Sequence, residues 1–374
     1  MKLASLETLS CDAGWRPWLF VKATTDEGLV GWSEVTDSHG SPTGLAGVVS
    51  DLAPLVVGRD PRAFEAIHWD LYRRTRQSPG SIVQKAIGGI ENALLDLKGK
   101  ALGAPVVELL GGVCSDRVPV VGYLFIDEPE ANARKAKAFV DAGYTELKLK
   151  VGRDFGQDHD AIAAIRDAVG PDVKLRIDAN MIWSVPAAIK WIRGLEKFDL
   201  QYVEQPVPDF DVAGLAQVRR SVAVPIAADE ACTDVRSALE LVKQDACDVF
   251  VVYPSEAGGL TRARQIAGIA EAAGKWCAIG SWAELGPATI ANAHLAAATS
   301  TFAFASDTHY PLQSEDVLMQ PLDMSDGLLA VPRSPGLGVE LDRVAMDRLA
   351  NNQVRESVFY DDIQGEAPRV GQIL

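Results

Sequence analysis

The chain has 374 residues, of which 48% are hydrophobic, and it carries a net charge of −15. This length can bury one large core beside a smaller one, and the negative charge argues against nucleic acid or an anionic membrane as a partner. No apolar run reaches the ~20 residues of a membrane span, and the first residues lack the apolar core of a signal peptide, so a cytoplasmic protein is expected. The five cysteines form no CxxC pair, which is typical of reduced thiols.

Residues 1–115 are predicted to form an N-terminal α+β domain. Residues 18–24 and 29–34 have strand character and flank Asp26-Glu27-Gly28, so this stretch is expected to be a β-hairpin. Residues 83–102 carry apolar side chains at helical spacing, and Gly103 with Pro105 marks the end of that helix.

From residue 116 to about 325, short β-type runs alternate with helix-length amphipathic stretches. The predicted strands are residues 118–123, 146–151, 174–178, 201–204, 226–228, 249–252, 276–279 and 301–305. Helices are predicted between them, for example at residues 130–142, 158–168, 186–194 and 260–273. The alternation predicts an α/β fold, a modified TIM (β/α)8 barrel under an α+β capping domain. A doubly wound sheet is the alternative, but no GxGxxG turn follows an early strand. Residues 326–374 are predicted to complete the barrel and the cap.

The second predicted strand reads Leu147-Lys148-Leu149-Lys150-Val151, so its two lysines lie on the same face. An exposed edge strand with two solvated lysines is the simpler interpretation. In a parallel sheet, however, both faces are normally apolar, and two ammonium groups then need an anionic environment. Each cation also disfavours protonation of the other, which would lower a lysine pKa toward that of a general base.

The third, fourth and fifth strands end in Asp178, Glu204 and Asp229. In a barrel of this kind these ends converge, and three carboxylates would repel one another strongly without a divalent cation among them. Oxygen ligands without His or Cys favour a hard cation, and Mg2+ fits best. A single acidic residue at such a place could simply cap the next helix, but three in succession favour a metal site.

The chain resembles the enolase superfamily, in its muconate lactonizing enzyme and mandelate racemase branches. The motifs that carry this resemblance are Lys148-Leu149-Lys150, Asp178-Ala179-Asn180, Val203-Glu204-Gln205-Pro206, Ala228-Asp229-Glu230, Ala257-Gly258-Gly259-Leu260-Thr261 and Gly280-Ser281-Trp282-Ala283-Glu284. Residues 92–100 and 335–339 match as well, so the resemblance covers nearly the whole chain. Asp229 followed directly by Glu230 is closer to the muconate lactonizing branch, and Glu230 would support the metal ligands from behind.

The resemblance implies a cap over a barrel, one Mg2+ on the three carboxylates, and removal of the proton α to the carboxylate of a small-molecule substrate. It also implies a homo-oligomer. By analogy Lys150 would be the base, while Lys148 would lower its pKa and contact the substrate carboxylate. Sites of the enolase superfamily are known to combine a Lys or His base with Mg2+.

The sequence departs from both branches at the sixth strand. Family members usually carry a second base there, a Lys or an Asp paired with a His of the seventh strand, whereas this chain has Tyr253 and no seventh-strand His. With a pKa of about 10, tyrosine is a poor base. The departure favours a one-sided reaction in which Lys150 takes the proton and a β-group leaves with help from Tyr253 or His309, as in a dehydratase or a cycloisomerase. A racemase or epimerase is the alternative, and Tyr253 could also be a packed aromatic and His309 a surface residue.

Substrate choice in this family comes from cap loops at the barrel mouth. The candidate substrate-binding residues are Trp15, Arg16, His39, Asn180, Ser281, Trp282, Glu284 and Asp307. Arg16 could hold a distal carboxylate, and the polar members favour an acid sugar or a hydroxy acid, although the tryptophans could line an apolar slot.

Two other classes of protein are alternatives. A barrel glycoside hydrolase could use Glu204 and Glu284 as paired carboxylates, but this would leave both lysines and two of the strand-end acids without a role. A non-catalytic binding protein would require a decayed site, against which the intact acidic triad argues.

Overall fold

The computed structural model describes residues 1–12, 17–35, 40–78, 80–313 and 315–350. The predicted substrate-binding residues Trp15, Arg16 and His39 lie outside the described residues.

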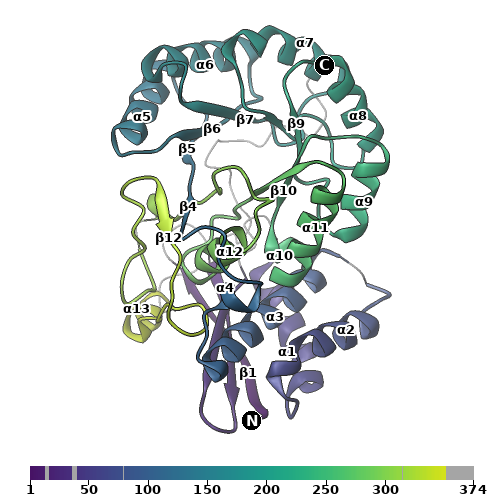
Figure 1. The fold of residues 1–374 in the computed structure, drawn as a ribbon, viewed down its shortest axis with the longest axis vertical. Coiled ribbons are helices and arrows are strands. Elements are labelled where there is room, and N and C mark those ends of the chain that lie inside the picture. The colour runs from purple at the N-terminus through teal and green to yellow at the C-terminus, as the bar shows by residue number, and fades with distance from the viewer. Residues whose placement is uncertain (13–16, 36–39, 79, 314, 351–374) are drawn as a thin grey trace.

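The N-terminal domain combines an antiparallel sheet with three long helices, at the bottom of Figure 1. Its elements are β1 (Leu3–Asp12), β2 (Pro17–Thr25), β3 (Val30–Glu34), α1 (Pro42–Val56), a 3-10 turn (Pro61–Ala63), α2 (Phe64–Arg74) and α3 (Ser81–Leu102). The predicted hairpin is confirmed as the β2–β3 pair, and Gly28 in its turn has a φ of 83°. Strand β1, which pairs along β2, was not predicted, because its burial does not follow a strict alternation.

Helix α3 connects this domain to the rest of the molecule. It ends where predicted, at Gly103 in the left-handed region with φ 66°. Its buried side chains Glu91 and Asn92 accept hydrogen bonds from the backbone N–H groups of Thr261 and Leu260, respectively. Because Gly88 has no side chain, the backbone of Gly258 and Gly259 can approach α3 closely: a Cβ there would lie 2.8 Å from the Gly259 nitrogen.

The second domain is built on a curled, parallel seven-stranded sheet in the order β11-β10-β9-β8-β7-β6-β5. Its strands are β5 (Gly122–Leu124), β6 (Glu146–Lys150), β7 (Lys174–Asp178), β8 (Val203–Glu204), β9 (Ile226–Ala228), β10 (Val249–Val252) and β11 (Trp276–Ile279). The register pairs Lys150 with Asp178 and Asp178 with Glu204, so the functional strand ends lie side by side.

Two strand predictions need correction. The first predicted strand is divided into β4 (Arg117–Pro119) and β5, and residues 301–305 do not form a continuous strand. Phe302 instead makes an isolated bridge to Cys277, which is in the edge strand β11. Ser306 makes another to Val120, just before the opposite edge strand β5. Backbone hydrogen bonds, such as Ala303 N–H to Cys277 and Ser306 N–H to Pro119, join this segment to the chain on either side, but they do not form the continuous ladder of a strand.

Helices alternate with the strands along the chain. They are α4 (Val106–Leu109), α5 (Pro129–Asp141), α6 (Phe155–Val169), α7 (Val185–Leu195), α8 (Val212–Ser221), α9 (Val235–Lys243), α10 (Pro254–Ala257), α11 (Leu260–Ala272) and α12 (Pro287–Ala297), with 3-10 turns at Glu196–Phe198 and Tyr310–Leu312. Those from α5 to α9 lie around the sheet in the upper part of Figure 1. Several begin at side-chain caps, such as Asp154 before α6 and Asp234 before α9, which accept N–H bonds of the first turn. The predicted alternation of strands and helices is therefore confirmed, and the fold is an α/β barrel-type domain with a separate cap.

The C-terminal segment returns to both domains. Strand β12 (Leu328–Ala330) pairs with β4, and α13 (Arg343–Ala350) contributes Met346 and Leu349 to a core that includes Trp18 and Phe20 of the cap. Among the described residues, no helix combines the length and the apolar character needed to cross a membrane.

Candidate active site

The three strand-end carboxylates converge at one point. Each of Asp178, Glu204 and Asp229 can offer an oxygen within 4.8 Å of the oxygens offered by the other two, and all three residues are buried. The predicted convergence of the strand ends is thus confirmed, and it provides oxygen atoms that could hold a metal ion. No other group of His, Cys, Asp or Glu among the described parts of the chain meets the same distance criterion.

The hydrogen bonding of the triad leaves room for a cation. Glu204 Oε2 and Asp229 Oδ1 are buried and have no hydrogen-bond partner among the described residues. Burial, followed by the charge of Asp178, raises the pKa of Glu204 to about 8. Burial and the neighbouring Glu230 likewise raise the pKa of Asp229 well above its ordinary value. Two buried carboxylates with unsatisfied oxygens fit a divalent cation, because it would satisfy both the oxygens and the charge.

Lys148 is the deepest cation of the site. Its Nζ lies 2.5 Å from Glu204, 2.7 Å from Asp307 and 3.1 Å from Asp178, and the residue is only 1% exposed. Burial lowers the pKa of Lys148, but these surrounding carboxylates outweigh that effect and raise it well above its ordinary value. Lys148 therefore serves as a fixed positive charge that holds the acidic cluster together.

Lys150 is less deeply buried than Lys148, with its side chain 14% exposed. Its Nζ donates to Asp178 Oδ2 at 2.6 Å and to Asn180 Oδ1 at 2.5 Å. Burial and, as expected, the charge of Lys148 act to lower the pKa of Lys150, but the attraction of Asp178 and other anionic groups is larger, so the pKa of Lys150 is raised. The expected net lowering of this pKa toward that of a general base is therefore wrong.

Asn180 and Glu230 extend this arrangement. Asn180 adopts the left-handed region with φ 42°, accepts from Lys150, and donates from Nδ2 to Glu230 Oε1 at 2.9 Å. Its backbone N–H also donates to Asp178 Oδ1. The amide predicted to bind substrate thus connects Lys150 with the partly buried Glu230 and orients both side chains.

The sixth-strand position is occupied by Tyr253, as the sequence requires, and its ring is buried. Its hydroxyl donates to Asp229 Oδ2 at 3.4 Å, and burial raises the pKa of Tyr253 well above its ordinary value. The ring lies 4.9 Å from that of Trp282, over which Lys85 of the cap is placed at 5.1 Å. Tyr253 thus supports a carboxylate of the triad, and its pKa is unsuited to a base.

The loop after β11 brings Ser281, Glu284 and His309 together. The Ser281 hydroxyl donates to Glu284 Oε2 and lies 3.0 Å from His309 Nδ1. Burial raises the pKa of Glu284 to about 7, against the opposing effect of the Ser281 hydrogen bond. His309 is buried at 8% exposure, so the alternative of a surface loop residue is excluded.

Asp307 was predicted to bind substrate, and the structure places it differently. Its two oxygens form ion pairs with Lys148 and with the fully buried Arg176. Both oxygens are therefore engaged inside the protein, and Asp307 links two buried cations.

Two site residues were missed by the sequence analysis. Tyr123, in β5, has the ammonium groups of Lys148 and Lys150 at 5.6 and 5.7 Å from its ring and the His309 ring at 4.2 Å. Arg176 projects into the barrel from β7 and also lies over the Tyr202 ring. Arg176 pairs with Lys148 in the sheet register, so the alternation argument applied to the lysine strand would have found it.

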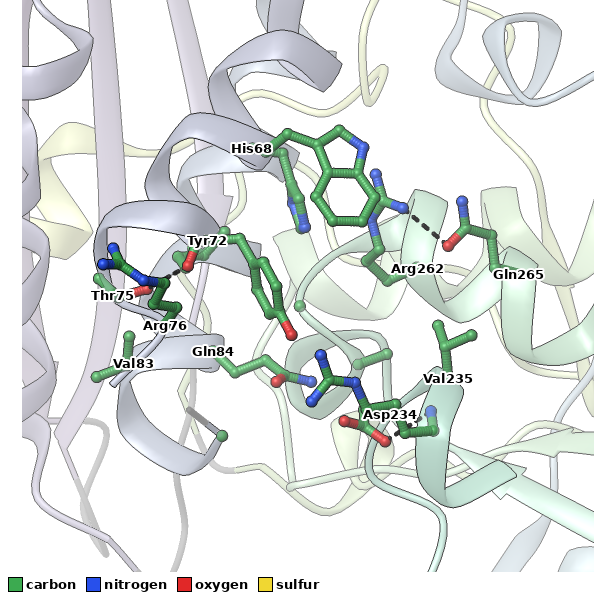
Figure 2. A pocket seen from close by; sticks show the side chains of 16 residues that line it. His68, Tyr72, Thr75, Arg76, Val83, Gln84, Asp234, Val235, Arg262 and Gln265 are labelled. Carbon is green, nitrogen blue, oxygen red and sulfur yellow. Dashed lines mark hydrogen bonds between the residues drawn. The ribbon is translucent and has the colours of Figure 1, made fainter. Parts of the chain in front are cut away.

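A separate cleft of about 230 Å3 lies between cap helices α2 and α3 and barrel helices α9 to α11 (Figure 2). His68, Tyr72 and Gln84 line it from the cap side, and Asp234 and Arg262 from the barrel side (Figure 2). None of the predicted catalytic or metal-binding residues lines this cleft, so it is distinct from the carboxylate site.

Comparison with known proteins decides the family. The model described as "Enolase C-terminal domain-like" matches residues 131–345, and that of the "Mandelate racemase / muconate lactonizing enzyme, N-terminal domain" matches residues 11–111. The chain belongs to the enolase superfamily, in its mandelate racemase and muconate lactonizing enzyme group. Membership in this superfamily implies a divalent metal, and the buried triad could hold it.

Relatives within the superfamily carry out several reactions. A hydrophobic dipeptide epimerase of Enterococcus faecalis is 36% identical over 85% of this chain and 90% of its own length. A D-galactonate dehydratase of Ralstonia nicotianae is 32% identical over 87% and 89%. The crystal structure of muconate cycloisomerase from Pseudomonas fluorescens has a TM-score of 0.87 at 30% identity, covering 93% of this chain and 98% of that chain. The protein is accordingly an isomerase or lyase of the enolase superfamily, and the glycoside hydrolase and binding-protein alternatives are set aside.

Proposed function

We propose that this enzyme is a Mg2+-dependent dehydratase or cycloisomerase that acts on an acid sugar or hydroxy acid, with Lys150 as its only base. The observation that carries this proposal is the asymmetry of the site. Lys150 lies on one side, while the sixth-strand position where a second base would be expected holds Tyr253, whose hydroxyl donates a hydrogen bond to Asp229.

The two lysines and the three carboxylates have different roles in the proposed reaction. Lys150 Nζ would take the proton on the α-carbon, with Asn180 and Asp178 fixing the position of the nitrogen. Lys148 would keep a positive charge close to the substrate carboxylate. A cation held by Asp178, Glu204 and Asp229 supplies, when bound, stabilisation of the negative charge that develops on the carboxylate oxygens.

Departure of the β-group needs a proton as well. His309 supports this role better than Tyr253, because its ring packs against Tyr123, whose ring is also close to the ammonium groups of both lysines. The Tyr253 hydroxyl already donates its hydrogen bond to Asp229 of the triad. In this scheme Lys150 gains the α-proton and His309 loses one to the leaving oxygen, so the charge of the two groups together is unchanged.

A polar group beside the base candidate supports the substrate class. Asn180 accepts from Lys150 and donates one N–H of its amide to Glu230, so its second amide N–H could bind a hydroxylated substrate. A racemase or epimerase remains the second candidate, supported by the 36% identity to a dipeptide epimerase.

The test is a screen of acid sugars, hydroxy acids and N-acyl amino acids in D2O, with Mg2+ or with EDTA, followed by proton NMR and mass spectrometry. Loss of water or ring formation only with Mg2+, abolished by Lys150→Met and retained by the surface control Lys190→Met, would support the proposal. Deuterium at the α-carbon of an otherwise unchanged compound whose configuration inverts would overturn it in favour of the racemase.

A further inference from the structure

The hydrogen-bonded chain from Glu284 through Ser281 to His309 contains groups whose donor and acceptor roles can be counted. Ser281 Oγ has one proton to give and two lone pairs. It donates to Glu284 Oε2, accepts the backbone N–H of Ala283 at 3.1 Å, and contacts His309 Nδ1 at 3.0 Å. With the proton and one lone pair used, the remaining lone pair must face His309.

It follows that His309 Nδ1 is the donor. An ionised Glu284 can only accept, and its other oxygen already accepts the backbone N–H of Trp282 at 3.0 Å. If Nδ1 carried no proton, the Ser281 hydroxyl would have to turn toward it, and Glu284 Oε2 would lose its donor inside the protein. Leaving a buried carboxylate oxygen without a donor is unfavourable. The hydrogen bonds from Glu284 through Ser281 therefore favour the tautomer of His309 with the proton on Nδ1.

The loop that contains Ser281 and Glu284 is held in place by the cap. Ala283 is a non-glycine residue in the left-handed region, with φ 59°, a conformation that persists only where surrounding contacts impose it. Its carbonyl accepts from Trp18 Nε1 at 3.0 Å, and Glu34 accepts the backbone N–H groups of Leu285 and Gly286. This backbone conformation directs the Ala283 N–H at Ser281 Oγ and so removes the serine's freedom to rotate.

We propose that Glu284 and Ser281 are positioning residues that keep the proton of neutral His309 on Nδ1, so that His309 exchanges its catalytic proton only through Nε2. The inference rests on the proposed function for the role of His309 in the reaction, but the tautomer itself does not depend on it. In the acid form, His309 would carry protons on both nitrogens and release the one on Nε2 to the leaving oxygen. The neutral product is then the tautomer that Ser281 stabilises, which favours the transfer.

The tautomer can be measured directly by 15N NMR on protein labelled at the histidine rings, with the signals of His309 assigned by their loss in His309→Gln. At pH 8.5, above the pKa of about 7 to which burial raises Glu284, Nδ1 should show the shift of a protonated nitrogen and Nε2 that of an unprotonated one. Ser281→Ala and Glu284→Gln should move the population toward the Nε2-protonated form, whereas Ser281→Thr, which keeps a hydroxyl, should resemble wild type. Ser325→Ala and Glu315→Gln make the same chemical changes in loops away from this hydrogen-bonded chain and serve as controls.

The results separate the inference from the proposed function. An unprotonated Nδ1 in the wild type, or an unchanged spectrum in Ser281→Ala, would overturn the tautomer assignment. If the tautomer shifts as expected, kcat on the substrate found in the screen should fall at least tenfold in Ser281→Ala, with little change in KM and with recovery in Ser281→Thr. A shifted tautomer with unchanged kcat would refute the positioning role and, with it, the assignment of His309 as the acid, while leaving Lys150 as base untouched.

Discussion

Replacement of Asp158 by Asn should stabilise the protein at neutral and alkaline pH. Asp158 lies in the first turn of α6, is only 4% exposed, and accepts the backbone N–H of Gly152 at 2.8 Å. Burial raises its pKa from 3.8 to about 7. The amide oxygen of Asn can accept the same hydrogen bond, so the substitution removes the buried charge and retains the contact.

The magnitude follows from the pKa. The folded value lies above the unfolded one, so the folded protein holds this proton more strongly. The corresponding stability is fully present below pH 3.8 and is lost as the pH rises to about 7. At about 1.4 kcal/mol for each pKa unit, the shift amounts to roughly 4 kcal/mol at most, and entry of water beside the ionised group would reduce it.

Urea unfolding at pH 5, 6, 7 and 8, followed by tryptophan fluorescence, measures this difference. The free energy of unfolding of Asp158→Asn relative to wild type should increase by roughly 2–3 kcal/mol between pH 5 and pH 8, most of it before pH 7. Asp160→Asn, on the same helix with its side chain 71% exposed, is the matched control and should show no such trend. If the Asp158→Asn and wild-type stabilities remained a constant distance apart at all four pH values, the reasoning from burial would be refuted.

Further predictions concern the active site and the domain contact. Removal of divalent ions with EDTA should abolish activity, and Mg2+ should restore it. Glu204→Gln should reduce kcat more than about 100-fold, because the cation and the carboxylate of Glu204 together set the charge balance of the buried triad. Full activity of the metal-free enzyme in a mass-spectrometric assay would disprove the metal assignment. Lys150→Met should reduce kcat about 10²- to 10⁴-fold without unfolding the protein, as checked by steady-state kinetics and circular dichroism, and a variant with near wild-type kcat would exclude Lys150 as base. Tyr253→Phe should keep kcat within about tenfold of the wild-type value. It should weaken Mg2+ affinity about 10-fold in a calorimetric titration, because the Tyr253 hydroxyl holds Asp229 by a hydrogen bond. A loss of kcat as large as that of Lys150→Met would instead make Tyr253 an acid or base. Gly88→Ala should destabilise the protein by about 1–3 kcal/mol in thermal unfolding, because its Cβ would lie 2.8 Å from the Gly259 nitrogen, and an unchanged Tm would show that α3 and the barrel can separate at little cost.

The sequence alone was sufficient to predict the barrel-type α/β fold and the convergence of three strand-end carboxylates. The alternation in residues 146–151 identified a strand with two lysines on one face, and β6 confirms it. The carboxylates Asp178, Glu204 and Asp229 could be grouped because the carboxyl ends of parallel strands meet at one edge of a sheet, whatever the intervening helices do. Such inferences succeed because they depend on periodicity and strand order, both of which are local properties of the chain.

Tertiary structure alone decided how the charges are shared. The sequence places two lysines side by side and predicts mutual repulsion, but folding surrounds Lys148 with three carboxylates and draws Lys150 to Asp178, which reverses the expected pKa shift. Asp307 appeared free to bind substrate until Arg176, from a distant strand, was found to occupy one of its oxygens. The link from Glu284 through Ser281 to His309 depends on the backbone conformation of Ala283, which Trp18 of the cap fixes from 265 residues away. These features arise from contacts between residues remote in sequence, and no local pattern records them.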